Sequence, residues 1–94
     1  MNIKGYYRHE EKNKDYPHRL DYFFTSKPEN AAYYTTRLDA ETGCKVLEMS
    51  QVSIPSSEGG FHTLRNFRVE EVSSDRFVVY CDGPFIPERA ATSL

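Results

Sequence analysis

The sequence contains no tryptophan, only two cysteines and no long uninterrupted run of apolar residues. A membrane-spanning helix needs about 20 mostly apolar residues, whereas the longest apolar run here is Phe77-Val78-Val79-Tyr80-Cys81. Residues 1–20 carry acids and bases where a secretory leader would have an apolar segment. We therefore expect a cytoplasmic protein with no membrane segment.

Two cysteines cannot build a disulfide framework, and they are expected to be reduced, partly buried thiols, with a single disulfide as the alternative. Zinc sites usually take closely spaced pairs of nitrogen or sulfur ligands. The residues with such ligands are scattered singly here, at His9, His18, Cys44, His62 and Cys81. The sequence thus predicts no metal site and no cofactor. A Cys81–His62 enzyme is the least favoured function.

Positive and negative side chains nearly balance, and the formal net charge is −2 over 94 residues. That length predicts a single domain over residues 1–94. The 13 aromatic residues argue against disorder, because disordered chains contain few of them. A small core gains stability by oligomerising, so we also expect a homodimer.

Alternating or apolar segments predict strands at residues 3–8, 19–25, 51–54, 61–72 and 76–81. In the second of these strands, Leu20, Tyr22 and Phe24 form the expected core face. The apolar pattern changes phase beside Glu70-Glu71, which indicates a bulge. Both faces of the strand at 76–81 are apolar, as is typical of a central strand. Residues 9–19 are polar and predict an exposed loop, and residues 87–94 predict a frayed tail.

Residues 31–49 are ambiguous between a helix and a hairpin. Thr36 can cap a helix over about residues 36–48, in which Ala40, Cys44 and Leu47 form an apolar stripe. The alternative is a hairpin, in which residues 39–43 form a turn between strands at 33–38 and 44–49; Gly43 inside a helix would cost only about 1 kcal/mol relative to alanine. The predicted fold is an α+β domain with an antiparallel sheet of four or five strands and this helix packed on one face. The alternative is an all-β meander or a small barrel.

The candidate functional residues are aromatic and basic side chains of the N-terminal half, which holds more aromatics than one face of a small sheet can cover. They are Tyr6, Tyr7, Arg8, Tyr16, Arg19, Phe23, Tyr33 and Tyr34. Because tyrosine, phenylalanine and arginine are enriched in protein interfaces, the sequence predicts a small non-enzymatic module that binds a protein partner or itself. The alternative is a module for single-stranded nucleic acid. It rests on residues 1–28, where six basic and four acidic side chains, a net charge of +2, are interleaved with tyrosines.

Overall fold

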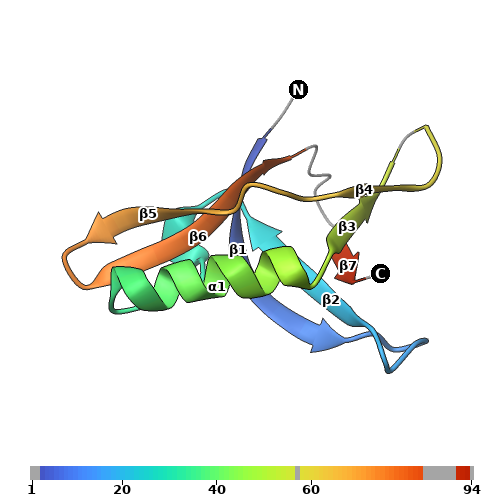
Figure 1. The fold of residues 1–94 in the computed structure, drawn as a ribbon, viewed down its shortest axis with the longest axis horizontal. Coiled ribbons are helices and arrows are strands. Elements are labelled where there is room, and N and C mark those ends of the chain that lie inside the picture. The colour runs from blue at the N-terminus through green and yellow to red at the C-terminus, as the bar shows by residue number, and fades with distance from the viewer. Residues whose placement is uncertain (1–2, 57, 84–90, 94) are drawn as a thin grey trace.

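A computed structural model describes residues 3–56, 58–83 and 91–93 of the chain. Within these residues the protein forms one antiparallel sheet of seven strands and one α-helix (Figure 1). The helix α1 spans Arg37–Met49, and a short 3-10 turn η1 spans Pro28–Asn30. The strands are β1 (Ile3–Lys12), β2 (Leu20–Thr25), β3 (Val52–Pro55), β4 (Phe61–Thr63), β5 (Arg68–Ser73), β6 (Arg76–Gly83) and β7 (Ala91–Ser93).

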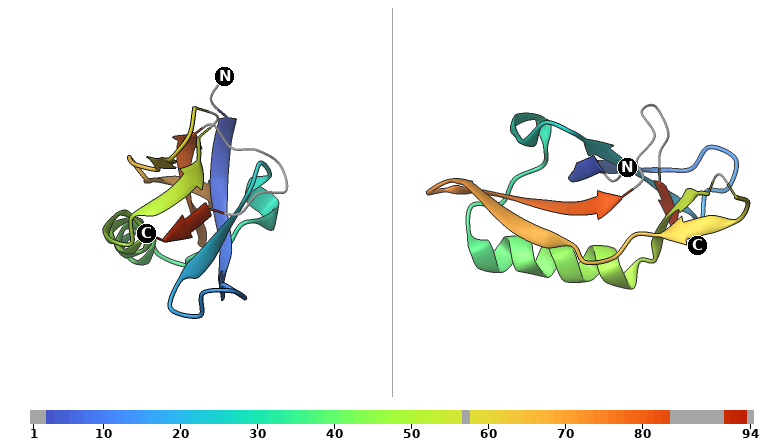
Figure 2. Two further views of the ribbon diagram at one scale, coloured as in Figure 1. Left: turned by 90° about the vertical axis from the view of Figure 1, so that its right-hand side faces the viewer. Right: turned by 90° about the horizontal axis from the view of Figure 1, so that it is seen from above.

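The sheet has the strand order β4-β3-β7-β2-β1-β6-β5, so its two edge strands are β4 and β5. These edges are consecutive along the chain and are joined only by residues 64–67. In a flat sheet, seven strands about 4.8 Å apart would separate the edges by about 29 Å. The link between Thr63 and Arg68 can span at most about 18 Å. The sheet must therefore curl, and α1 lies along one of its faces (Figures 1 and 2).

Alternating side chains of β6 supply both faces of the sheet with core residues. Phe77, Val79 and Cys81 join the main core, which also includes the buried face of α1. Val78 points the other way and packs with Tyr6 and Ala31 in a smaller cluster. We call the side of the main core the inner face and the side of the smaller cluster the outer face. Covering both faces of β6 explains its apolar run from Phe77 to Cys81.

The helix α1 begins as its sequence predicts. The Thr36 hydroxyl accepts a hydrogen bond from the Asp39 amide at 3.2 Å, which satisfies one of the unpaired donors at the helix start. Ala40, Cys44 and Leu47 are its buried residues. The predicted helix over 36–48 is thus confirmed, and the alternative hairpin at Gly43 is wrong.

Gln51 follows α1 with a φ of +50°, in the left-handed region that disfavours a side chain. Glycine is the residue that most often adopts this conformation just after a helix. The left-handed conformation costs a residue with a side chain about 1–2 kcal/mol, and the extra flexibility of glycine costs about 0.5–1 kcal/mol. Replacing Gln51, which is exposed, with glycine is therefore expected to raise the free energy of unfolding by about 0.5–1 kcal/mol. Urea denaturation measures this change. Gln51→Val is the control and should be destabilising; a glycine variant no more stable than the valine variant would contradict this account of the helix end.

The predicted fold class is wrong. The described part of the chain is mostly sheet, with seven antiparallel strands rather than the four or five expected beside a packed helix. Two features add strands. The expected long strand over 61–72 is divided into β4 and β5, because Asn66 takes a φ of +61° between them. The C-terminal β7 inserts between β3 and β2. The alternative meander also fails, because β7 lies between β3 and β2 and β6 lies beside β1, so the strand order does not follow the sequence.

Three local predictions are confirmed. Leu20, Tyr22 and Phe24 all belong to the main core or pack against it. The register between β5 and β6 shifts between Glu71 and Ser73, at the predicted bulge. The expected central strand at 76–81 is β6, which pairs with β1 on one side and β5 on the other.

Two predicted irregular segments are partly wrong. Residues 9–12 of the expected loop over 9–19 continue β1 and pair with β2, so polar side chains here mark an exposed strand. In the expected frayed tail over 87–94, Ala91–Ser93 forms β7 because its backbone completes pairs with both β2 and β3. Residues 87–90 and 94 lie outside the described residues.

Candidate interaction surface

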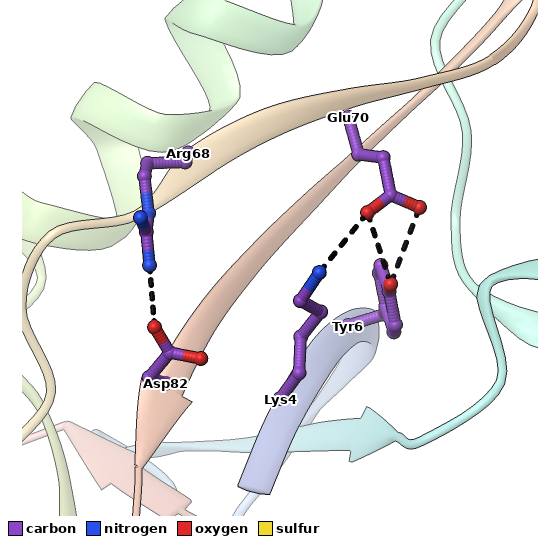
Figure 3. A network of polar contacts seen from close by, with 5 residues as sticks. All are labelled: Lys4, Tyr6, Arg68, Glu70 and Asp82. Atoms are coloured by element: carbon purple, nitrogen blue, oxygen red, sulfur yellow. Dashed lines mark hydrogen bonds and ion pairs between the residues drawn. The ribbon is translucent and has the colours of Figure 1, made fainter. Parts of the chain in front are cut away.

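The outer face carries a network of polar contacts around β1, β5 and β6 (Figure 3). Lys4 Nζ lies 3.3 Å from Glu70 Oε1, and the Tyr6 hydroxyl donates to the same carboxylate at 3.1 Å. Arg68 forms an ion pair with Asp82. The contact with Glu70 raises the pKa of Lys4, while burial, and then Glu70, raise the pKa of Tyr6. Both cations of the network, Lys4 and Arg68, thus have an acidic partner.

Tyr80 is the aromatic centre of this outer network. Lys4 Nζ lies 4.5 Å and Arg68 Cζ 5.1 Å from its ring centroid, while the Tyr6 ring lies 5.7 Å away. Cations at such distances are attracted to the ring. Tyr6, one of the candidate residues, is buried here and offers no free surface for a ligand.

Most other candidate residues lie apart from one another. Tyr16 and Arg19 share the β1–β2 loop, with the guanidinium 5.1 Å from the ring centroid. Phe23 stacks on His9 at 4.6 Å, with 13° between the planes. Arg8 is exposed where the β1–β2 register shifts.

Tyr33 and Tyr34, although adjacent in sequence, have different surroundings. Tyr33 is exposed, and Arg76 Cζ lies 4.3 Å from its ring centroid. Tyr34 is half-buried and packs against the main core.

The backbone of residues 31–34 fixes the position of Tyr34. Ala31 packs on the outer face, and the amide of Ala32 donates to the Tyr7 carbonyl at 3.0 Å. Tyr34 then pairs with Phe77 through two backbone hydrogen bonds of 2.8 Å. A Cβ atom added to Gly43 would lie 2.5 Å from the Tyr34 hydroxyl oxygen. Glycine within the helix therefore makes room for the end of this ring.

A groove of about 390 Å³ lies between α1 and β1, and we call it the α1–β1 groove. It is the place where two candidate residues, Tyr7 and Tyr34, come together. The lining residues are Tyr7, Glu10, Tyr34, Asp39, Thr42, Gly43, Val46 and Leu47. Burial, and then the charge of Glu10, raise the pKa of Tyr7 to about 12. Burial is also the main cause that raises the pKa of Tyr34. Both phenols therefore stay neutral and able to donate at pH 7.

The helix side that faces away from the main core is also apolar. Leu38, Val46 and Met49 form what we call the α1 stripe, and their exposed fractions are 72%, 56% and 83%. With Thr42 they fall at i, i+4, i+8 and i+11, which places them along one side of a helix. The Thr42 hydroxyl already donates to the Leu38 carbonyl at 3.0 Å. Val46 belongs to both the stripe and the groove, so the two surfaces are continuous.

The α1 stripe, Glu10 and Asp39 were not predicted as functional residues from the sequence. A helical projection of residues 37–49 would have revealed the stripe, because its members lie opposite Ala40, Cys44 and Leu47. No local signal places Glu10 beside α1. That proximity depends on the course of β1 beyond its expected end.

Cys44 and Cys81 are free and buried in the main core. Chiefly through burial, the pKa of Cys44 is raised to about 11 and that of Cys81 to about 12. A nucleophilic cysteine needs the opposite shift. His62, the suggested base, is exposed on the edge strand β4.

The thiol pKa shifts predict alkaline destabilisation. Unfolding returns both thiols to ordinary pKa values near 9.0, so above that pH the unfolded chain loses protons more readily than the folded one. Stability is therefore expected to fall between about pH 9 and 12. Urea midpoints in reductant at pH 8.5 and 10.5 measure the fall. In Cys81→Ala the stability should fall less between these two pH values. A fall as large as that of the unaltered protein would contradict the attribution of the effect to the thiols.

In the described part of the chain, no group of three or more histidine, cysteine or acidic side chains gathers as a metal site would require. None of the helices in that part combines the length and apolar character needed to cross a membrane. Comparison with protein-family models, curated proteins and solved structures found no match to this chain.

Proposed function

We propose that this chain is a small non-enzymatic interaction module that docks a protein partner on the α1 stripe and the adjoining α1–β1 groove. The observation that carries the proposal is the exposure of Leu38, Val46 and Met49 on a helix whose opposite side is already buried. Fully burying an aliphatic side chain of this size is worth about 1.5–3 kcal/mol. Three such side chains, next to two tyrosines, give a partner substantial apolar surface to cover.

The charges beside the stripe favour a different protein over a second copy of this chain. Glu10 and Asp39 line the groove, and among the residues that the structure describes no basic side chain lines it with them. A partner that brings a cation would complement this surface. Self-association through the same stripe is the alternative that the experiment must distinguish.

Single-stranded nucleic acid is the second candidate ligand. Tyr16 is exposed beside Arg19 in the β1–β2 loop, and Lys12 and Lys14 are exposed next to it. Binding there would weaken steeply with salt, because it depends on phosphate contacts. A salt titration with an oligonucleotide tests this candidate, and Tyr16→Ala should reduce the affinity if bases stack on the ring.

Cysteine protection tests docking on the stripe. The variant Met49→Cys places a thiol on α1, and the control Val72→Cys places one on the edge strand β5. Each thiol replaces an exposed apolar residue. In purified protein both thiols should react rapidly with a maleimide. In the cells that produce the protein, position 49 should be protected and position 72 should stay reactive.

The same experiment separates the alternatives. Protection of position 49 in the purified protein, rising with its concentration, would show self-association in place of a separate partner. Equal labelling of positions 49 and 72 in cells would contradict docking on the stripe.

A further inference from the structure

The α1–β1 groove differs from three other hollows in the described part of the chain by the sign of its charges. The second hollow beside α1 is lined by Arg37, Lys45 and Arg68 as well as by Glu41 and Glu48. The two hollows near residues 64–67 also combine arginine with acidic side chains. In the α1–β1 groove both charged groups, Glu10 and Asp39, are acidic.

These two carboxylates have no charged partner among the residues that the structure places. The ion pairs found there are Lys4–Glu70 and Arg68–Asp82, and His9 contacts Glu11 in a pair that is ionic only when the histidine is protonated. Glu11, next to Glu10 but on the other face of β1, thus contacts His9, whereas Glu10 is exposed and faces the groove. A cation brought by a ligand would find an unshared carboxylate here.

The groove also offers what a flat cationic group needs besides charge. Tyr7 and Tyr34 contribute aromatic rings and neutral hydroxyls, while Val46 and Leu47 contribute apolar surface. A guanidinium is planar, binds carboxylates through two parallel hydrogen bonds and packs on aromatic faces. Lysine has a more strongly hydrated point charge and lacks this flat surface.

We propose that the α1–β1 groove binds an arginine side chain of the partner, flanked by apolar residues that cover the α1 stripe. The inference rests on the proposed function and specifies the chemistry of the segment that docks. Glu10 binds the guanidinium, Asp39 adds attraction from the start of α1, and the two tyrosines bound the site. The apolar neighbours of the arginine reach Val46 and then Met49.

Two capped peptides test the inference on purified, ¹⁵N-labelled protein. One is acetyl-Leu-Arg-Leu-amide, and the other contains citrulline, which keeps the shape of arginine without its charge. The arginine peptide should shift the amide resonances of Glu10, Thr42 and Gly43. The citrulline peptide should bind about two- to fivefold more weakly, as expected from the loss of an accessible ion pair.

A matched pair of variants assigns the effect to the groove. Glu10→Gln should weaken binding of the arginine peptide by about two- to fivefold. Glu11→Gln removes the same charge from the adjacent position on the opposite face, and it should leave the affinity unchanged. Equal weakening by both variants would overturn the proposal, because it would reveal only long-range attraction.

The remaining outcomes separate this inference from the proposed function. If both peptides bind equally and shift only residues of the α1 stripe, the arginine site is wrong while docking on the stripe stands. If neither peptide shifts a resonance of the groove, the arginine site is also wrong. The proposed function is then decided separately, by protection of position 49.

Discussion

Replacing Phe77 with alanine is expected to lower the free energy of unfolding by about 3–5 kcal/mol. Its ring is 7% exposed and belongs to the main core, where truncation removes buried contacts and leaves a cavity. Its backbone pairs with Tyr34, and Arg37 Cζ lies 5.3 Å from the ring centroid. A small domain is stable by only about 5–15 kcal/mol, so this variant should be close to unfolding at room temperature.

Phe61 provides the control for this prediction. It is 52% exposed at the start of the edge strand β4, so Phe61→Ala should change stability by less than about 1 kcal/mol. Urea denaturation followed by circular dichroism measures both variants. Equal losses at Phe77 and Phe61 would contradict the placement of the main core beneath α1.

Replacing all three residues of the α1 stripe with glutamine is expected to weaken docking strongly without unfolding the helix. Glutamine favours helices about as well as leucine and methionine, and better than valine. The combined Leu38→Gln, Val46→Gln and Met49→Gln variant should therefore keep its stability within about 0.5 kcal/mol. Loss of three apolar contacts should weaken binding at least about tenfold, which corresponds to 1.4 kcal/mol.

A cysteine in place of Thr42, on the same side of α1, reports this loss. In cells it should be protected from a maleimide when the stripe is intact and become at least about tenfold more reactive when the stripe is replaced. Val72→Gln, on the edge strand β5, is the matched control and should leave the protection intact. Persistent protection in the triple variant would place the docking surface elsewhere.

Local structure was predictable wherever a short segment determines it. The Thr36 cap and the apolar residues Ala40, Cys44 and Leu47 specify α1, a helix of 13 residues, from within or next to it. The alternation in β2 and the phase change beside Glu71 are equally local. Each of these signals comes from periodicity or from a side chain that bonds to a nearby backbone group.

The strand count could not be predicted because it depends on distant pairing. Ala91–Ser93 is too short to be recognised alone and becomes a strand because β2 and β3 leave a space between them. Polar residues 9–12 resemble a loop, but their backbone pairs with β2. The break at Asn66 requires only one residue in the left-handed region, which asparagine adopts more readily than most.

The candidate site was predictable only in part for a related reason. Composition pointed to surplus aromatics in the N-terminal half, and two of them, Tyr7 and Tyr34, line the α1–β1 groove. Ala31, at the start of the segment 31–34, packs with Tyr6 and covers this remaining aromatic residue. Which aromatics stay accessible depends on that segment, and no pattern within the N-terminal strands encodes its path.

The most direct test of docking on the α1 stripe is photo-crosslinking in the cells that produce the protein. A photoreactive benzoylphenylalanine replaces Val46 in one variant and Val72 in the other, and mass spectrometry identifies what each attaches to. We predict a discrete product from position 46 alone, joined to a partner segment that contains an arginine beside apolar residues. If both positions give the same products, or if only position 72 gives a product, docking on the α1 stripe is contradicted.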